Sequence, residues 1–150
     1  MSGEVLVDTN VLVYAYDRSE PVKQQQAVEV LDTLAAHDLV VVSTQILAEF
    51  FVTVTRKISA PLTPSEAYGR LENFLQSWGI LDVTGLVVLE AARGVRDYQF
   101  SFWDAQIWAL AHLNQFRVIF SEDFNTHAVI EGVRFVNPFE PNFHISDWIS

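Results

Sequence analysis

The chain has 150 residues, of which 50% are hydrophobic and 13% aromatic, and this composition excludes an intrinsically disordered protein. It contains no cysteine, which excludes disulfides and thiolate metal sites and suits the reducing cytoplasm, where we expect the protein. The 9 basic and 19 acidic residues give a formal net charge of −10, which argues against tight nonspecific binding to nucleic acid. No apolar run approaches the roughly 20 residues of a membrane span, and no secretory signal is recognisable.

The first half of the chain predicts two short apolar strands, each followed by helices. In chain order these elements are a strand at Val5–Val7, helices at Val11–Tyr16 and Val22–Ala36, a strand at Leu39–Val42 and a helix from Gln45 to about Lys57. The longer of the first two helices carries apolar residues at helical spacing, namely Val28, Leu31, Leu34 and Ala35. Ser43 and Thr44 are suited to cap the helix that begins at Gln45.

The second half continues this alternation and contains one clear helix start. Thr63-Pro64-Ser65-Glu66 combines a capping threonine, a proline at the first helical position and a glutamate three residues after the cap. The buried stripe predicted for this helix consists of Ala67, Leu71, Phe74, Leu75 and Trp78. The later elements are a strand at Ile80–Val83, helices from Gly85 to about Asp97 and at Trp103–Asn114, and strands at Phe116–Phe120 and, more weakly, Val133–Val136.

Strands that alternate with helices predict an α/β fold, a three-layer α/β/α sandwich around a mainly parallel sheet of about five strands. The sequence has no recognisable domain boundary or repeat, so we expect one domain over residues 1–150, with an irregular tail over residues 137–150. In such sheets the functional site lies beyond the carboxyl ends of the strands. This rule selects the acidic residues that matter.

Carboxylates from separate parts of the chain are expected at that edge. Asp8 ends the first strand, and Ser121-Glu122-Asp123 follows the fourth. Glu49 lies about one and a half turns into the helix after the second strand, where a charge on the flank of the apolar stripe is costly unless it is paired or coordinated. Asp104 is in the first turn of the helix that precedes the fourth strand.

Each acid also has a purely structural interpretation. Asp8 could cap the next helix, Asp104 could complete a capping box with Ser101, and Asp123 could be a turn residue. Glu49 could pair with a buried arginine. The functional hypothesis therefore depends on convergence of the four acids at one edge, with no lysine or arginine next to them in the sequence.

Such a cluster repels itself unless cations enter, and all-oxygen ligation suits Mg²⁺ or Mn²⁺. A divalent ion there would lower the pKa of a bound water and neutralise a phosphodiester during in-line attack. Polar residues beside the acids could orient water or a ligand carboxylate: Thr9, Asn10, Ser43 and Ser121. An aspartate-nucleophile phosphatase would need a second aspartate at the position of Asn10. The pattern thus predicts a metal-dependent nuclease.

At these residues the chain resembles the PIN-domain family, and within it the VapC-type ribonuclease toxins of prokaryotic toxin–antitoxin pairs. The pieces that carry the resemblance are Val7–Leu12, Ser43–Phe50, Phe102–Ala105 and Ser121–Phe124. The resemblance implies strand order 3-2-1-4-5 and Mg²⁺ or Mn²⁺ at a quartet formed by Asp8, Glu49, Asp104 and Asp123, with Asn10 and Ser121 in support. Glu122 could replace Asp123 as the last acid, and we favour Asp123.

The resemblance also implies a homodimer and inhibition by an antitoxin with a basic segment. We therefore predict a metal-dependent endoribonuclease, the toxin of a type II toxin–antitoxin pair. The alternatives are a non-catalytic interaction module on the same fold and an RNA-processing nuclease outside such a pair. Candidate RNA contacts are Arg18, Lys23, Arg56, Lys57, Arg93 and Arg96. With so few cations we expect modest RNA affinity, and selectivity from shape or exposed bases.

Overall fold

The computed structural model describes residues 3–149 and is built around a six-stranded sheet in the order β3-β2-β1-β4-β6-β5. The strands are β1 (Val5–Val7), β2 (Val40–Ser43), β3 (Gly79–Leu81), β4 (Val118–Phe120), β5 (Val129–Ile130) and β6 (Val133–Val136). Neighbouring strands pair in parallel, except for β5, which is antiparallel to β6. The expected α/β fold with order 3-2-1-4-5 is confirmed, with β6 as the predicted fifth strand.

The additional strand β5 forms a hairpin with β6, and the sequence analysis did not predict it. The two strands are joined by Glu131 and Gly132, whose φ angles are 48° and 85°. A two-residue hairpin turn with positive φ at both positions is common where glycine is present, because glycine adopts such angles without strain. The available signal was Gly132 with β-branched residues on both sides of the turn, Val129 and Ile130 before it and Val133 after it.

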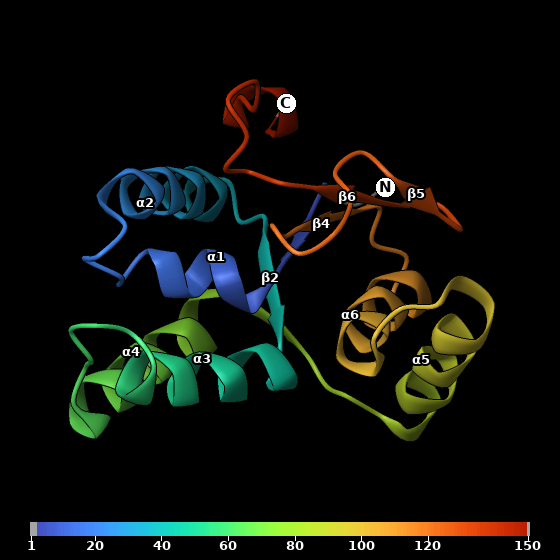
Figure 1. The fold of residues 1–150 in the computed structure, drawn as a ribbon, viewed down its shortest axis with the longest axis horizontal. Helices are drawn as coiled ribbons and strands as arrows, with labels where there is room; N and C mark the ends of the chain where they lie inside the picture. Colours follow the sequence, from blue (N-terminus) through green and yellow to red (C-terminus); the bar gives the residue numbers. More distant parts are fainter. Residues whose placement is uncertain (1–2, 150) are drawn as a thin grey trace.

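Helices flank the sheet in two groups (Figure 1). The helices are α1 (Thr9–Tyr14), α2 (Pro21–Ala36), α3 (Thr44–Arg56), α4 (Pro64–Ser77), α5 (Gly85–Tyr98) and α6 (Phe102–Leu113), followed by a short 3₁₀ helix at Ile145–Trp148. Helices α1 to α4 lie together, whereas α5 and α6 form a separate pair (Figure 1). None of the helices within residues 3–149 combines the length and apolar composition that a membrane span requires.

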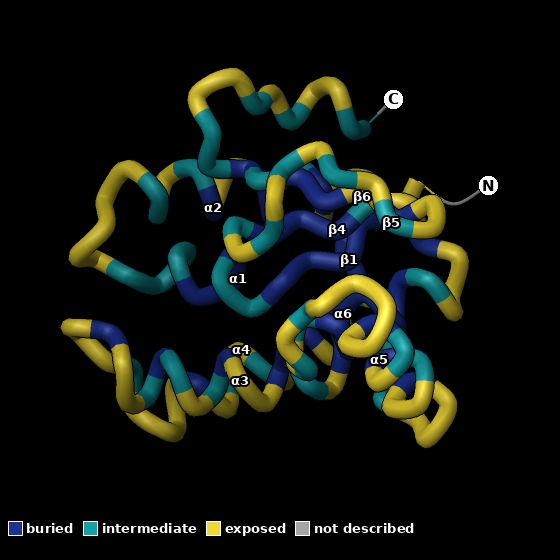
Figure 2. The backbone as a smooth tube through the Cα atoms, turned by 45° about the vertical axis from the view of Figure 1, so that its right-hand side comes forward, coloured by how far each residue is buried: buried dark blue, intermediate teal, exposed yellow. Residues whose placement is uncertain are grey.

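The core follows from the apolar runs. All of β1 and β2 is buried, as expected for parallel strands covered on both faces, and β1 lies near the centre of the molecule (Figure 2). Helix α6 is buried without interruption from Ala105 to Ala111, because it is apolar around most of its circumference. Its Trp108 packs against α5 at Gly94, where an added Cβ would lie 3.0 Å from the indole ring.

Two predicted helix faces were partly wrong. In α2 the buried residues are Ala27, Val30, Leu31 and Leu34, while Val28 and Ala35 are exposed. In α4, Leu75 is 58% exposed, because its neighbour Phe74 takes the buried position and adjacent helical residues point about 100° apart. The predicted helix start at Thr63 is confirmed as a reciprocal capping box with Glu66.

The C-terminal tail packs against the chain itself. The ring of Phe139 meets Tyr14 edge-on at 5.0 Å between centroids. Phe143 and Trp148 both contact Phe120 of β4, at 5.5 and 5.8 Å. The tail thus packs against α1 and β4.

Candidate active site

Asp8 is the most buried of the predicted site acids, with 3% of its surface exposed. It follows β1 and caps α1, and one carboxylate oxygen accepts a hydrogen bond from the Thr9 amide at 2.7 Å. The other accepts from the Ser121 hydroxyl at 2.7 Å. Val7 pairs with Phe120, so the parallel register of β1 and β4 places Asp8 and Ser121 side by side. The capping interpretation is therefore correct, and it does not account for the burial.

The pKa of Asp8 is raised to about 7, mainly by burial. The hydrogen bonds from Ser121 and Thr9 lower this pKa, and the charges of Asp123 and Glu49 raise it. A buried carboxyl normally has a cationic partner, since an unpaired charge is costly in a low-dielectric setting. Asp8 has none among the described residues. Its environment is therefore suited to an incoming cation.

Asn10 and Ser121 hold the loop after β4. The Asn10 amide donates to the Ser121 hydroxyl at 3.2 Å, and its carbonyl accepts from the Glu122 amide at 3.3 Å. The Ser121 hydroxyl also accepts from the Asp123 amide at 3.1 Å. These bonds bring the start of α1 and the loop after β4 together around Asp8, as the sequence analysis expected.

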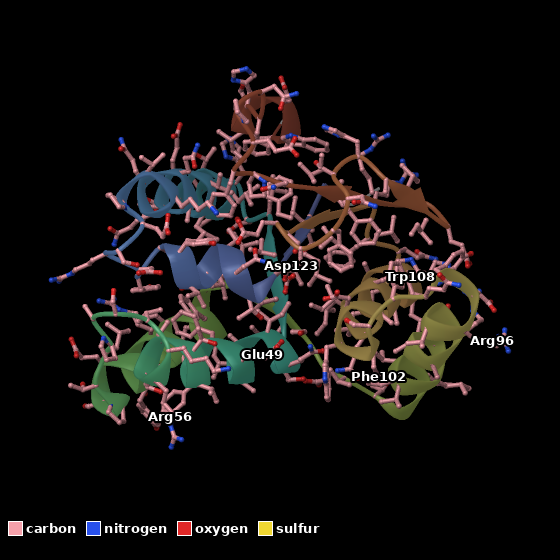
Figure 3. The ribbon with its side chains drawn as sticks, viewed as in Figure 1. Glu49, Arg56, Arg96, Phe102, Trp108 and Asp123 are labelled. Carbon is pink, nitrogen blue, oxygen red and sulfur yellow. The ribbon has the colours of Figure 1, made fainter. Side chains whose placement is uncertain are left out.

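Glu49 faces the same region from α3. Its carboxylate accepts hydrogen bonds from Gln45 at 3.0 Å and, more weakly, from the Thr9 hydroxyl at 3.4 Å. Among residues 3–149, Glu49 forms no ion pair with an arginine, so the alternative interpretation is wrong. Figure 3 shows Glu49 and Asp123 near the middle of the molecule, on elements far apart in the sequence.

Two glutamines that the sequence analysis missed support Glu49. The side-chain amide of Gln106 in α6 donates to the side-chain oxygen of Gln45 at 2.5 Å. The side-chain amide of Gln45 in turn donates to the Glu49 carboxylate. Gln106 is only 5% exposed. The available signal was a lone amide within the otherwise apolar stretch from Ala105 to Ala111.

Asp104 lies half-buried in the first turn of α6, and its amide donates to the capping Ser101 hydroxyl at 3.2 Å. Burial raises the pKa of Asp104, the hydrogen bond with Ser101 lowers it, and the charge of Asp123 raises it, so Asp123 is near enough for its charge to act on Asp104. The helix-capping role predicted for Ser43 is confirmed. Ser43 is fully buried, and its hydroxyl caps α3 by accepting from the Ile46 amide at 3.1 Å.

Three of the six predicted RNA-contact residues are engaged by carboxylates. Lys23 pairs with Glu122, Arg93 with Glu90, Asp97 and Glu131, and Arg96 with Asp97. The other three, Arg18, Arg56 and Lys57, are exposed and form no ion pair within residues 3–149. Lys57 and Asp123 both line one groove of about 370 Å³, together with Thr9, Asn10 and Tyr14.

The four acids fit a hard divalent cation by their chemistry. Each offers only oxygen ligands, and none forms an ion pair with lysine or arginine in the described part of the chain. Within residues 3–149, no three acidic or histidine side chains are close enough to hold an ion as they stand. Ligation would therefore require their side chains to move inward.

Comparisons with known proteins agree with this arrangement. Residues 5–131 match the model of the PIN domain family. The chain resembles a toxin–antitoxin complex from Klebsiella pneumoniae, with a TM-score of 0.67, 20% identity and coverage of 91% of this chain and 99% of that chain. It also resembles VapC20 of Mycobacterium tuberculosis, described as a sarcin–ricin loop cleaving toxin, with a TM-score of 0.61, 18% identity and coverage of 87% and 99%.

A third similar structure is a DNA-bound VapBC from Salmonella typhimurium, with a TM-score of 0.62, 17% identity and coverage of 90% of this chain and 97% of that chain. A comparison with curated protein sequences found no match. At these identities the solved structures establish the fold, and the family model spans most of the sequence. The chain therefore belongs to the PIN-domain family.

Proposed function

We propose that the protein is a metal-dependent endoribonuclease and the toxin of a type II toxin–antitoxin pair. The observation that carries this proposal is Asp8, a buried carboxyl with no cationic partner among residues 3–149, whose pKa is raised by burial and by the charges of Asp123 and Glu49. Membership of the PIN-domain family supports nuclease chemistry, and similar solved structures named as toxins and toxin–antitoxin complexes support the biological role.

Asp8, Glu49, Asp104 and Asp123 would hold Mg²⁺ or Mn²⁺. The bound ion would supply an activated water and offset charge on the scissile phosphodiester. Ser121 and the Thr9 amide fix the orientation of Asp8, and Gln45 orients Glu49. No side chain of the protein needs to act as a nucleophile.

RNA cleavage by Asp8→Asn tests the proposal. Asparagine retains the size of the side chain and the acceptor for the Thr9 amide, so the fold should persist. We expect wild type to cleave single-stranded RNA in Mg²⁺ or Mn²⁺, to lose activity in EDTA and to regain it when the ion is restored. Asp8→Asn should reduce cleavage about 100-fold or more.

Asp32→Asn is the matched control, because it makes the same charge change at an exposed position of α2. It should cleave RNA like wild type. Equal cleavage by wild type and Asp8→Asn, or cleavage that persists in EDTA, would refute the nuclease proposal and favour a non-catalytic module.

The antitoxin is proposed to be a protein with a basic segment that enters the acidic edge. The net charge of −10 and the unpaired acids support a cationic partner. Expression of wild type should arrest growth, Asp8→Asn should not, and co-expression of the product of a neighbouring gene should relieve the arrest. Growth unaffected by wild type would favour an RNA-processing nuclease outside a toxin–antitoxin pair.

A homodimer is also proposed. Leu86 and Leu89 lie one turn apart on α5 and are 72% and 68% exposed, which makes this helix a candidate interface. Sedimentation should give a dimer for wild type and a monomer for Leu86→Lys/Leu89→Lys. Val22→Lys, at a residue of α2 with 70% exposure, should remain dimeric.

A further inference from the structure

The neighbouring acids Glu122 and Asp123 have opposite surroundings. Glu122 accepts hydrogen bonds from the Tyr14 hydroxyl at 2.5 Å and from the Lys23 ammonium at 3.0 Å. Asp123 is exposed, lines the groove that includes Asn10 and Lys57, and forms no ion pair within the described part of the chain. The sequence alone does not distinguish these two carboxylates as candidates for the last acid, but their hydrogen-bond and ion-pair partners do.

Lys23 joins segments that are distant in the sequence. From the start of α2, its ammonium lies 3.3 Å from the Tyr14 hydroxyl and 4.8 Å above the Tyr14 ring. It also lies 5.8 Å from the ring centroid of Phe139 in the tail. The bond to Glu122 raises the pKa of Lys23, so the lysine stays charged at neutral pH and the bond stays charge-assisted.

The loop after β4 is consequently held from two sides. Asn10 and Ser121 bind its backbone amides, while Lys23 and Tyr14 bind the Glu122 side chain. Asp123 remains as the carboxylate of this loop that lines the groove, and its charge acts on Asp8 and Asp104.

We infer that Lys23, Tyr14 and Glu122 form a positioning clamp that commits Glu122 to a structural role and presents Asp123 to the metal. This inference rests on the proposed function, because it concerns the last ligand of that site. Without the clamp, the loop would sample other conformations, and Asp123 would have to be ordered when the ion binds. The clamp therefore acts on metal affinity through the loop and contacts neither metal nor RNA.

Mn²⁺ titration of the full chain by calorimetry tests the clamp, because the clamp and the change in charge predict opposite changes in Mn²⁺ affinity. Lys23→Met removes a positive charge, so general electrostatics would tighten cation binding. The clamp instead predicts binding about tenfold weaker, the effect typical of lost outer partners of a metal site. Glu122→Gln should weaken binding similarly, and Lys23→Met/Glu122→Gln should be no worse than either single variant.

Arg134→Met is the charge-matched control, because Arg134 is exposed on β6 and forms no ion pair within residues 3–149. It should bind Mn²⁺ at least as tightly as wild type. Mn²⁺ binding by Lys23→Met that equals or exceeds that of wild type would overturn the inference.

Hydrogen exchange of the metal-free protein separates this inference from the proposed function. The backbone amides of residues 121–125 should exchange faster in Lys23→Met than in wild type. In Arg134→Met their exchange rates should equal those of wild type. Unchanged exchange in Lys23→Met would overturn the clamp whatever the metal does. If wild type binds no Mn²⁺, the proposed nuclease and the role of Asp123 as a metal ligand are both refuted. Faster exchange of the loop in Lys23→Met would in that case still support the contacts of the clamp.

Discussion

The chain contains two groups of carboxylates that differ in their partners. At the carboxyl edge of the sheet, Asp8, Glu49, Asp104 and Asp123 form no ion pair within the described residues. Between α5, α6 and the β5–β6 hairpin, Arg93 lies 2.7 Å from Glu90 and 2.8 Å from Glu131. His112 also contacts Glu90, at 2.7 Å. We call this second group, Glu90, Arg93, Asp97, His112 and Glu131, the paired cluster.

The two regions shift carboxyl pKa values in opposite directions. The hydrogen bonds from Arg93 and Tyr98 lower the pKa of Glu131 to about 2, whereas burial raises that of Asp8 to about 7. A lowered pKa means that the fold stabilises the anion. A raised pKa means that the fold disfavours the anion relative to the protonated acid, and such shifts are frequent at functional sites. The comparison separates the ion-paired acids from the acids of the proposed site more clearly than residue type can.

Loss of Trp108 should have the largest effect, and it should fall on stability. Trp108 is fully buried, Arg93 lies over its ring at 5.4 Å, and its indole donates to Ile130 at 3.2 Å. Trp108→Ala should cost about 3–5 kcal/mol in urea denaturation, from lost burial and the cavity left behind. Trp103→Ala, at a residue with 62% exposure, should change stability by less than about 0.5 kcal/mol.

Asp123→Asn should have the next largest effect, on RNA cleavage instead of stability. We expect about a 100-fold loss of kcat/KM, equivalent to about 2.7 kcal/mol, because one of the four proposed ligands loses its charge. Glu131→Gln, in the paired cluster, should retain activity per folded molecule. Similar losses in both variants would erase the functional distinction between the two regions.

Much of the fold could be predicted from local patterns. Apolar runs of β-branched residues identified the central strands, and the capping residues of Thr63-Pro64-Ser65-Glu66 identified α4. The phase of helix burial was less predictable. Leu75 and Phe74 are both apolar, and only packing against the rest of the chain decides which of them is buried. The β5–β6 hairpin was missed because β5 has only two residues.

The site was predictable as far as it depends on strand ends. Asp8 directly follows β1, and Asp123 lies in the loop that follows β4. The topology of a parallel sheet alone therefore assigns both residues to its carboxyl edge. The partners of these acids were not predictable. Gln106 reaches Gln45 across 61 residues, and Lys23 reaches Glu122 across 99, which only the tertiary fold can bring together. The same limit explains why Arg93 was proposed as an RNA contact although three carboxylates surround it.

Acidic pH should weaken the paired cluster. The folded-state pKa of Glu131 is lowered from 4.5 to about 2, so its contribution to stability is present above about pH 4.5 and is lost as the pH falls toward 2. The difference in unfolding free energy between wild type and Glu131→Gln should therefore shrink from pH 5 to pH 2. Glu72→Gln, at an exposed residue of α4, should show no such trend. A constant difference across this range would contradict the pairing.

The smallest effect is expected for RNA binding, measured with Asp8→Asn as the non-cleaving background. Lys57→Ala should weaken binding a few-fold and reduce the slope of log K against log salt by about 1, as for one lost phosphate contact. Arg96→Ala should change neither quantity. Asp97 already pairs with Arg96 at 2.7 Å, whereas Lys57 has no ion pair within residues 3–149 and lines a groove with Asp123. A cation that is already neutralised by a carboxylate of the protein releases few counterions from RNA. Equal effects of the two variants would therefore mean that ion pairing within the protein does not determine which cations bind RNA.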